Sequence, residues 1–259
     1  MHLIDTHTHL YLEAFDKDRN QVSERALTVG VNHFFLPAIN SKYFKRMLDL
    51  KEQYPKKIHL MAGLHPCYVK EDFNEELNLV SNLLKSKNLC AIGEIGIDLY
   101  WDKSFLKQQQ DAFQKQIQLA IDHKLPIVIH CREAFDEIFE ILDQFKSEKL
   151  FGIFHCFTGS IKQANKAIGL NFKLGIGGVV TYKNGRIDQF IKKLPLESIV
   201  LETDSPYLSP TPLRGKRNES SHLTMILKKV SDCFNISVEE IARITTKNAM
   251  EVFKKVDFK

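Results

Sequence analysis

Residues 2–9 read HLIDTHTH, an apolar strand pattern that runs directly into two histidines. Two α/β folds suit a chain that alternates strands and helices, and they differ at this point. A doubly wound open sheet needs a Gly-rich phosphate-binding loop after its first strand, whereas a (β/α)8 barrel gathers catalytic side chains at the ends of its strands. The His-Thr-His end of the first strand therefore favours the barrel.

Seven further strand patterns follow, each a short run of β-branched and aromatic residues with an amphipathic segment after it. Their ends recur about every 28 residues, close to the ~30 of a strand–helix crossover unit. Eight such units in 259 residues match a TIM barrel, so we expect an α/β fold with a single domain over residues 1–259. The predicted strands are residues 2–6, 32–37, 58–64, 90–95, 126–130, 151–155, 172–177 and 199–202.

The clearest helix patterns lie at residues 104–123 and 133–145. Ser104 is the expected N-cap of the first of them, because a serine oxygen can accept a hydrogen bond from the free backbone N–H groups of a first turn. Two more helical segments, residues 219–234 and 237–253, follow the last strand. We expect them to close the barrel and cover one of its ends.

The composition excludes several classes of protein. With 44% hydrophobic residues the chain can bury a core, which excludes a mainly disordered protein. The net charge of +4 is too small for nonspecific nucleic-acid binding over the whole surface, so a site for an anion must be local. The five cysteines show no CxxC spacing, which argues against a zinc finger and a disulfide framework. Since neither a signal peptide nor an apolar run of ~20 residues occurs, we expect a cytoplasmic protein without membrane association.

Residues with metal-ligand chemistry stand at the ends of five predicted strands. Each alone is weak evidence, but together they place unpaired polar groups where an apolar core would not. Imidazole and carboxylate hold ions such as Zn²⁺ or Mn²⁺, and six ligands are too many for one tetrahedral ion with an open position. The pattern therefore predicts two divalent ions (Mg, Mn or Zn). The predicted ligands are His7, His9, Glu94, His130, His155 and Asp204.

Seven motifs around these residues keep a fixed order along the chain. They are HTH (7–9), GLHP (63–66), GEIGID (93–98), IHCREA (129–134), HCFTGS (155–160), LETDSPYL (201–208) and GKRNE (215–219). In this order they resemble the TatD family of metal-dependent deoxyribonucleases, which have amidohydrolase-like barrels. The resemblance extends from about residue 4 to residue 253.

The resemblance implies which residues hold each ion. One ion would be held by His7, His9 and Asp204, the other by His130 and His155, with Glu94 as the bridge between them. The catalytic residues would be Glu94, Asp204 and His65: Asp204 would take the proton of the attacking water, and His65 would contact the scissile phosphate. The implied activity is hydrolysis of DNA, often as a 3′-to-5′ exonuclease that prefers single strands.

The loops after the predicted strands also suit a phosphodiester substrate. The predicted substrate contacts are His65, Arg132, Tyr207 and Arg217. Aromatic residues expected on the same rim would stack on unpaired bases; they are Tyr100, Trp101, Phe157, Tyr182 and Tyr207. We therefore expect DNA, single-stranded by preference, as the substrate. No obligate protein partner is indicated.

Two other functions stay open at this level. Amidohydrolase-type barrels also begin with HxH but cleave C–N or ester bonds, such as the D-aminoacyl ester of a charged tRNA. Many of them bridge their metals with a carbamylated Lys, whereas the fourth strand here ends in Glu94. The remaining alternative is a non-catalytic, metal-stabilised scaffold that binds nucleic acid, but a structural site would be closed by four ligands.

Overall fold

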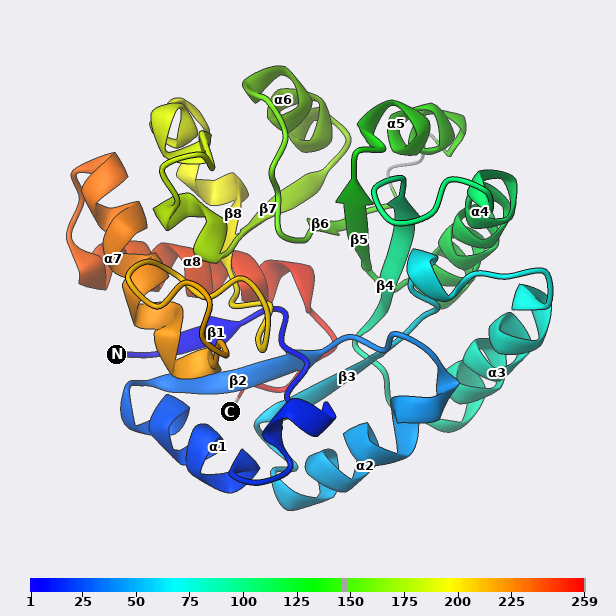
Figure 1. The fold of residues 1–259 in the computed structure, drawn as a ribbon, viewed down its shortest axis with the longest axis horizontal. Coiled ribbons are helices and arrows are strands. Elements are labelled where there is room, and N and C mark those ends of the chain that lie inside the picture. The colour runs from blue at the N-terminus through cyan, green and yellow to red at the C-terminus, as the bar shows by residue number, and fades with distance from the viewer. Residues whose placement is uncertain (146–148, 259) are drawn as a thin grey trace.

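Eight parallel strands, neighbours in space in the order in which they follow in the chain, form the centre of the molecule (Figure 1). The computed structural model describes residues 1–145 and 149–258, to which all counts here refer. Every predicted strand is present, and β4 runs three residues beyond its predicted end at residue 95. The strands are β1 (Leu3–Asp5), β2 (Val31–Leu36), β3 (Ile58–Ala62), β4 (Ala91–Asp98), β5 (Ile127–Arg132), β6 (Gly152–Phe154), β7 (Phe172–Ile176) and β8 (Ile199–Leu201).

The last strand returns to the first. The Thr6 backbone N–H donates to the Leu201 carbonyl at 3.1 Å, and the Asp204 N–H donates to the His7 carbonyl at 2.9 Å. These bonds bring the ends of β8 and β1 together, so the sheet forms a (β/α)8 barrel in one domain. The predicted fold class is confirmed.

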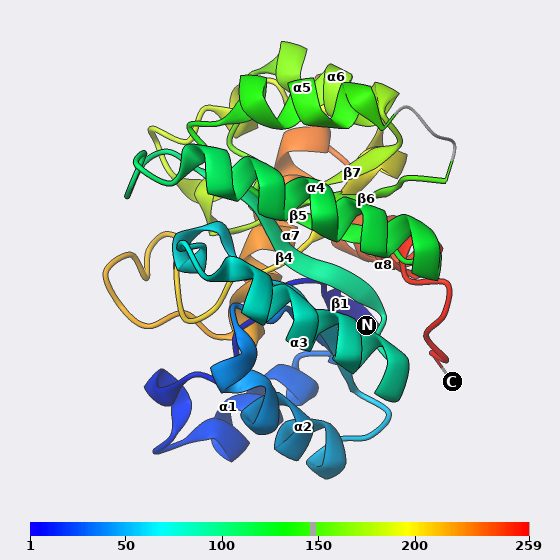
Figure 2. The same ribbon diagram turned by 90° about the vertical axis from the view of Figure 1, so that its right-hand side faces the viewer.

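Helices surround the strands (Figures 1 and 2). The first six each follow the strand of the same number, four short 3₁₀ segments between residues 178 and 198 replace a helix after β7, and two helices follow β8. Within the described residues, no helix is both long and apolar enough to cross a membrane. The helices are α1 (Arg19–Thr28), α2 (Phe44–Gln53), α3 (Phe73–Ser86), α4 (Leu106–His123), α5 (Phe135–Gln144), α6 (Ile161–Gly169), α7 (Leu223–Phe234) and α8 (Val238–Val252).

Helix α4 shows where the sequence pattern was right and where it was not. Its apolar stripe, which includes Phe113 and Ile117, is buried as the helical spacing predicts. The predicted cap at Ser104 is wrong, because the helix begins at Leu106 without a side-chain cap. The Asp102 carboxylate instead accepts hydrogen bonds from the Ser104 N–H and hydroxyl, which holds Ser104 in a turn before the helix.

The C-terminal helix covers the N-terminal ends of the strands, as predicted. Phe253, just after α8, is fully buried and its ring stacks on Phe35 of β2 with centroids 3.9 Å apart. The same apolar cluster contains Ile4, Val128 and Val200 from the strands. An apolar cluster therefore closes the barrel at this end, and the predicted ligands gather at the opposite end.

Candidate metal centre

All the ligand-type residues predicted from the sequence, together with His65, gather at the C-terminal ends of the strands. They come from six strands (β1, β3, β4, β5, β6 and β8) or from the residues directly after them. The most exposed of them, His130, has a side chain only 15% exposed. The gathered residues are His7, His9, His65, Glu94, His130, His155 and Asp204.

A buried carboxylate fixes the place where β1 and β8 end. Asp5 accepts hydrogen bonds from the Thr203 N–H at 2.9 Å, from the Thr203 hydroxyl at 2.6 Å and from the His7 N–H at 3.4 Å. Burial raises the pKa of Asp5 to about 7, against these hydrogen bonds, which act to lower it. The backbone turns after both strands are thereby held together, which places His7 beside Asp204.

Glu94 lies between two sets of histidines, with one carboxylate oxygen turned to each. Its Oε2 is 3.2 Å from His7 Nε2 and 3.6 Å from His9 Nε2. Its Oε1 is 2.8 Å from His130 Nδ1, 3.1 Å from His155 Nε2 and 3.3 Å from His65 Nε2. Only 2% of Glu94 is exposed, so its carboxylate is largely shielded from bulk water.

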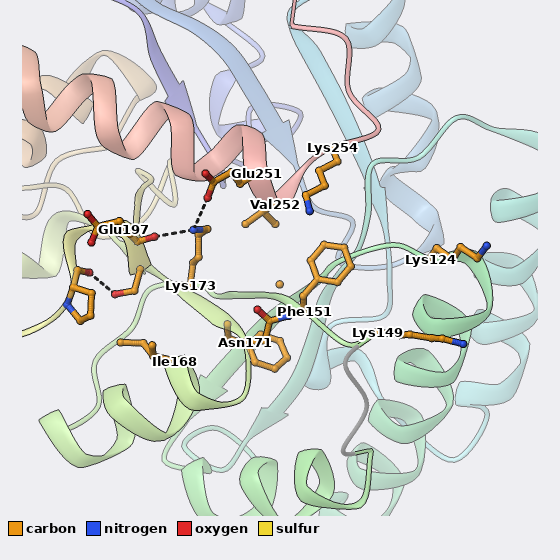
Figure 3. A pocket seen from close by; sticks show the side chains of 14 residues that line it. Lys124, Lys149, Phe151, Ile168, Asn171, Lys173, Glu197, Glu251, Val252 and Lys254 are labelled. Atoms are coloured by element: carbon orange, nitrogen blue, oxygen red, sulfur yellow. Dashed lines mark hydrogen bonds and ion pairs between the residues drawn. The ribbon is translucent and has the colours of Figure 1, made fainter.

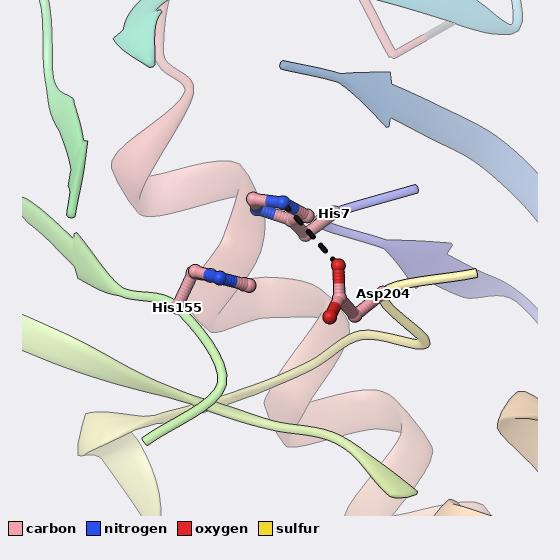
Figure 4. Close-up of side chains that lie close together, drawn as sticks. All are labelled: His7, His155 and Asp204. Atoms are coloured by element: carbon pink, nitrogen blue, oxygen red, sulfur yellow. Dashed lines mark ion pairs between the residues drawn. The ribbon is translucent and has the colours of Figure 1, made fainter. Parts of the chain in front are cut away.

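Asp204 completes the first set. Its Oδ1 lies 3.3 Å from His9 Nε2 and 3.7 Å from His7 Nε2. Figure 4 shows Asp204 and His155 on either side of His7, whose ring stacks on that of His155 at 3.7 Å between centroids. Asp204 has φ of 57°, a left-handed backbone that a residue with a Cβ adopts at an energetic cost and that is typical of functional sites.

The charges of the centre hold its carboxylates in the ionised form. Burial acts to raise the pKa of Glu94, but the histidines around it, His155 first, keep it well below its usual range. Burial likewise acts to lower the pKa of His155, and Glu94 and Glu202 outweigh it and hold that pKa well above its ordinary value. The centre is thus organised around buried negative charge that attracts cations.

The donor set fits divalent cations. His7 Nε2 and His9 Nε2 lie 3.3 Å apart and both face Glu94 Oε2, so nitrogen and oxygen ligand atoms converge on one point. Glu94 shares in two of the close groups, as a bridging carboxylate would. Among the described residues the groups that could hold an ion are His7–His9–Glu94, His65–Glu94–His130 and His7–His155–Asp204.

The structure brings His65 nearer to this centre than its predicted role as a phosphate contact requires. Its Nε2 faces the same Glu94 oxygen as His130 does, and the ring centroids of His65 and His130 are 4.4 Å apart. His65 therefore stands where it can either ligate an ion or touch a phosphate that the ion binds. Its role as a substrate contact stays a prediction.

Two carboxylates behind the histidines were missed in the sequence. Asp98 Oδ2 lies 2.9 Å from His130 Nε2, and Glu202 Oε1 lies 3.2 Å from His155 Nδ1. Such carboxylates orient a ligating imidazole and increase its basicity. Glu202 fits because Gly175 has no side chain: a Cβ there would lie 2.2 Å from Glu202 Oε2. Even spacing from a predicted ligand within one strand end was the signal that could have found both residues.

A cavity of about 680 Å³ opens above the centre. Three of the four predicted substrate contacts, His65, Arg132 and Tyr207, line it. Arg217 is not among the lining residues; its guanidinium donates to both oxygens of Asp18, at 2.7 and 2.6 Å, and to the Ala14 carbonyl at 2.7 Å. The structure thus gives Arg217 partners within the chain, and its contact with substrate stays a prediction.

Histidine and carboxylate donors at the C-terminal ends of barrel strands define the class of metal-dependent hydrolases with a (β/α)8 fold. Within that class, the chain belongs to the family described as TatD related DNase, whose sequence model matches residues 4–254. The match runs from β1 to the end of α8 and confirms the resemblance carried by the motifs.

Relatives of nearly the same length agree with this assignment. The metal-dependent hydrolase YabD of Bacillus subtilis (strain 168) is 37% identical over 253 residues, which cover 97% of this chain and 99% of YabD. A metal-dependent hydrolase of Haemophilus influenzae is 34% identical over 98% of this chain and 100% of its own length. The crystal structure of YjjV, a TatD homologue from Escherichia coli K12, has a TM-score of 0.92 at 29% identity and covers 97% of this chain and 98% of YjjV. The protein is accordingly a metal-dependent hydrolase.

Proposed function

We propose that this hydrolase is a deoxyribonuclease that cleaves DNA phosphodiester bonds with two divalent ions and degrades single strands from the 3′ end. The observation that carries the proposal is the position of Glu94, whose two oxygens face two separate sets of histidines. A carboxylate in that position suits a bridge between two ions, and pairs of ions are a recurring solution for phosphodiester hydrolysis.

The residues present would hold the two ions as the family resemblance implies. When bound, divalent ions supply Lewis-acid stabilisation of the charge on phosphoryl oxygens and make water a better nucleophile near neutral pH. Side chains of the protein accept the proton and orient the histidine rings. Asp204, ionised and directed at the first histidine set, accepts the proton of the attacking water. Glu202 and Asp98 keep the rings of His155 and His130 in fixed orientations.

A DNA substrate fits the charges around the cavity. Arg132 lines it, and its guanidinium contacts the Tyr100 and Trp101 rings, which leaves its hydrogen-bond donors available to a phosphate. Exposed rings on the same rim, Tyr207 and Trp101 among them, offer faces to unpaired bases. We also place the protein in the cytoplasm, since its five cysteines are all free.

The test is a time course on a 5′-labelled single-stranded oligonucleotide, resolved on a denaturing gel. Parallel reactions contain Mg²⁺, Mn²⁺, Zn²⁺ or EDTA, because imidazole ligands favour Zn and Mn whereas phosphoryl chemistry often uses Mg. We expect a metal-dependent ladder that shortens from the 3′ end. Glu94→Ala and Asp204→Ala should each reduce turnover by more than about a thousandfold while the far-UV circular dichroism is unchanged.

Glu197→Ala is the matched control, because it removes an exposed carboxylate at the other end of the barrel. It should cleave like the wild-type protein. Full activity in Glu94→Ala and Asp204→Ala would contradict the mechanism. No cleavage with any metal, in protein shown to hold two ions, would contradict the choice of substrate and point to ester or amide hydrolysis instead.

A further inference from the structure

The loop after β4 exposes an aromatic side chain beside the metal centre. Trp101 is 69% exposed, more than any other large hydrophobic side chain in the described residues, and it is the single tryptophan of the chain. It lines the cavity that also contains His130 and Asp204. An exposed indole at the mouth of this cavity is available for contact with whatever binds there.

Trp101 does not stand alone but is part of a layered platform. The Tyr100 ring meets it edge to face, with centroids 5.0 Å apart at 88°. The guanidinium carbon of Arg132 lies 3.7 Å from the Tyr100 ring centre and 5.4 Å from that of Trp101. The guanidinium is thus held by cation–π contacts, which orient it without using its hydrogen-bond donors.

One carboxylate ties this platform to the metal centre. Asp98 Oδ1 accepts hydrogen bonds from the Tyr100 N–H at 2.9 Å and from the Trp101 N–H at 3.1 Å, while its Oδ2 faces His130 Nε2. The buried side chain of Gln109 holds the same loop by accepting from the Asp98 N–H at 2.8 Å. The backbone that carries both rings is therefore held beside the ligand set before substrate arrives, which reduces the entropy lost on binding.

We propose that Trp101 is the stacking surface for an unpaired base of the substrate, next to the phosphate that Arg132 contacts. This inference rests on the proposed function and names the part of the site that recognises a single strand. Arg132 selects a polyanion, and a flat exposed indole beside it selects a partner with a free π-face. A base in a duplex keeps both faces stacked on its neighbours, so the platform favours single-stranded over double-stranded DNA.

The binding test uses the tryptophan fluorescence of the metal-loaded protein, excited at the long-wavelength edge of the indole band where the seven tyrosines do not absorb, so that it reports on Trp101. The probe is a phosphorothioate strand of about ten thymidines, which resists cleavage, with an abasic strand of equal length and charge as its control. We expect the thymidine strand to quench the fluorescence and the abasic strand to leave it unchanged. Equal quenching by both strands would overturn the proposal, as would a change that follows protein concentration without DNA, which would indicate self-association.

The kinetic test uses the cleavable oligonucleotide. Trp101→Ala should raise its KM about tenfold with kcat within about twofold, because stacking is the same in the ground and transition states. Trp101→Phe should restore most of the loss, and Leu79→Ala, which removes an exposed apolar side chain on α3 away from the cavity, should have no effect. An unchanged KM in Trp101→Ala would refute the stacking role even if the nuclease is active. Base-dependent quenching in a protein that cleaves no DNA would instead refute the proposed function.

Discussion

Two hollows of nearly equal volume lie at opposite ends of the barrel, about 680 Å³ above the metal centre and about 670 Å³ beside the N-terminal ends of the strands. The second is lined by lysines, and Figure 3 shows Lys173 directed at its partners. Lys173 donates to the Glu197 carbonyl at 2.7 Å and to the Glu251 carboxylate at 3.2 Å. The first hollow instead has three buried carboxylates, Glu94, Asp98 and Asp204, with several imidazoles facing them. The two cavities have similar volumes, so it is the buried charge that distinguishes the candidate reaction centre from a space between packed helices and strands.

The histidines of the two ends show the same contrast. At the closed end, His33 Nδ1 lies 2.9 Å from His59 Nε2. Burial lowers the pKa of His33 to about 4 and that of His59 to about 3, and the positive charges of Lys57 and Lys51 act in the same direction. At the open end Glu94 and Glu202 raise the pKa of His155, whereas burial and the charge of His155 lower that of His7. The histidines of the open end thus face carboxylates, and those of the closed end face each other.

We expect residues at the closed end of the barrel to contribute to stability but not to activity. The substitution with the largest expected effect on the free energy of unfolding tests this. Phe253→Ala removes the ring that stacks on Phe35 and leaves a cavity in the apolar cluster, so the free energy of unfolding should fall by about 3–5 kcal/mol. Denaturant unfolding gives this value, and kcat per folded molecule should stay within about twofold of the wild type. Leu79→Ala, an exposed truncation, is the control. If Phe253→Ala keeps its stability but loses turnover, the division between the two ends is wrong.

At the open end, Glu202→Gln should weaken the centre without unfolding the protein. The amide keeps the volume but loses the charge that orients His155, so kcat/KM at limiting metal should fall about 10- to 100-fold. Raising the metal concentration should restore part of the loss, which a purely structural defect would not allow. The measurement is activity as a function of Mn²⁺ concentration. Glu197→Gln is the matched control, and an unchanged metal dependence in Glu202→Gln would exclude the positioning role.

The histidine pair of the closed end predicts a dependence of stability on pH. The folded pKa of His59 lies near 3, below the ordinary 6.5, so above pH 6.5 the ring is neutral in both states and contributes nothing. As the pH falls below 6.5, His59 becomes protonated in the unfolded state but stays neutral in the folded state. The free energy of unfolding therefore decreases until about pH 3. At pH 5 this amounts to about 2 kcal/mol.

His59→Phe removes this titrating group while keeping an aromatic ring against Phe35. Between pH 7.5 and pH 5, the variant should therefore lose about 2 kcal/mol less stability than the wild-type protein, as measured by urea unfolding at each pH. His123→Phe, which removes a histidine at the end of α4, serves as the control. Parallel pH profiles for the wild type and His59→Phe would contradict a buried neutral pair.

The fold was readable from the sequence because each barrel unit repeats the same local pattern. Strand ends shifted by a few residues, since β4 continues to Asp98 where the pattern seemed to end earlier. The predicted cap at Ser104 was wrong for a local reason: Asp102, two residues earlier, accepts hydrogen bonds from the Ser104 N–H and hydroxyl and holds Ser104 in a turn before the helix. Local pattern predicts that an element exists better than it predicts where it begins.

Within the candidate centre, only the predicted metal ligands could be identified from the sequence, not the carboxylates behind them. Ligand-type residues at strand ends converge because the barrel brings all those ends together, so Glu94 and His155 follow from the fold. The even spacing between Glu202 and Asp204 was a signal for Glu202, but the space for its side chain depends on Gly175 of a neighbouring strand, which the local pattern does not contain. Arg217 was predicted to contact substrate because it lies in a loop rich in cationic residues. It is instead paired with Asp18, 199 residues away in the sequence, and no local pattern can predict such a contact.

The smallest effects are expected for the two arginines predicted to contact substrate, one paired within the chain and the other on the cavity wall. Arg217 is bound to Asp18 through both its terminal nitrogens at a partly exposed site, where such pairs contribute at most about 1 kcal/mol. Arg217→Ala should therefore reduce the free energy of unfolding by about 1 kcal/mol or less and leave the KM for an oligonucleotide within about twofold.

Arg132→Ala is the counterpart, because its guanidinium lies on the cavity wall and stacks on Tyr100. It should raise KM severalfold and flatten the dependence of KM on salt concentration, since a phosphate contact releases counterions. Both variants are assayed on one oligonucleotide from about 50 to 200 mM salt. If Arg217→Ala flattens the salt dependence as much as Arg132→Ala does, Arg217 leaves Asp18 for the substrate, and the loop after β8 belongs to the binding surface.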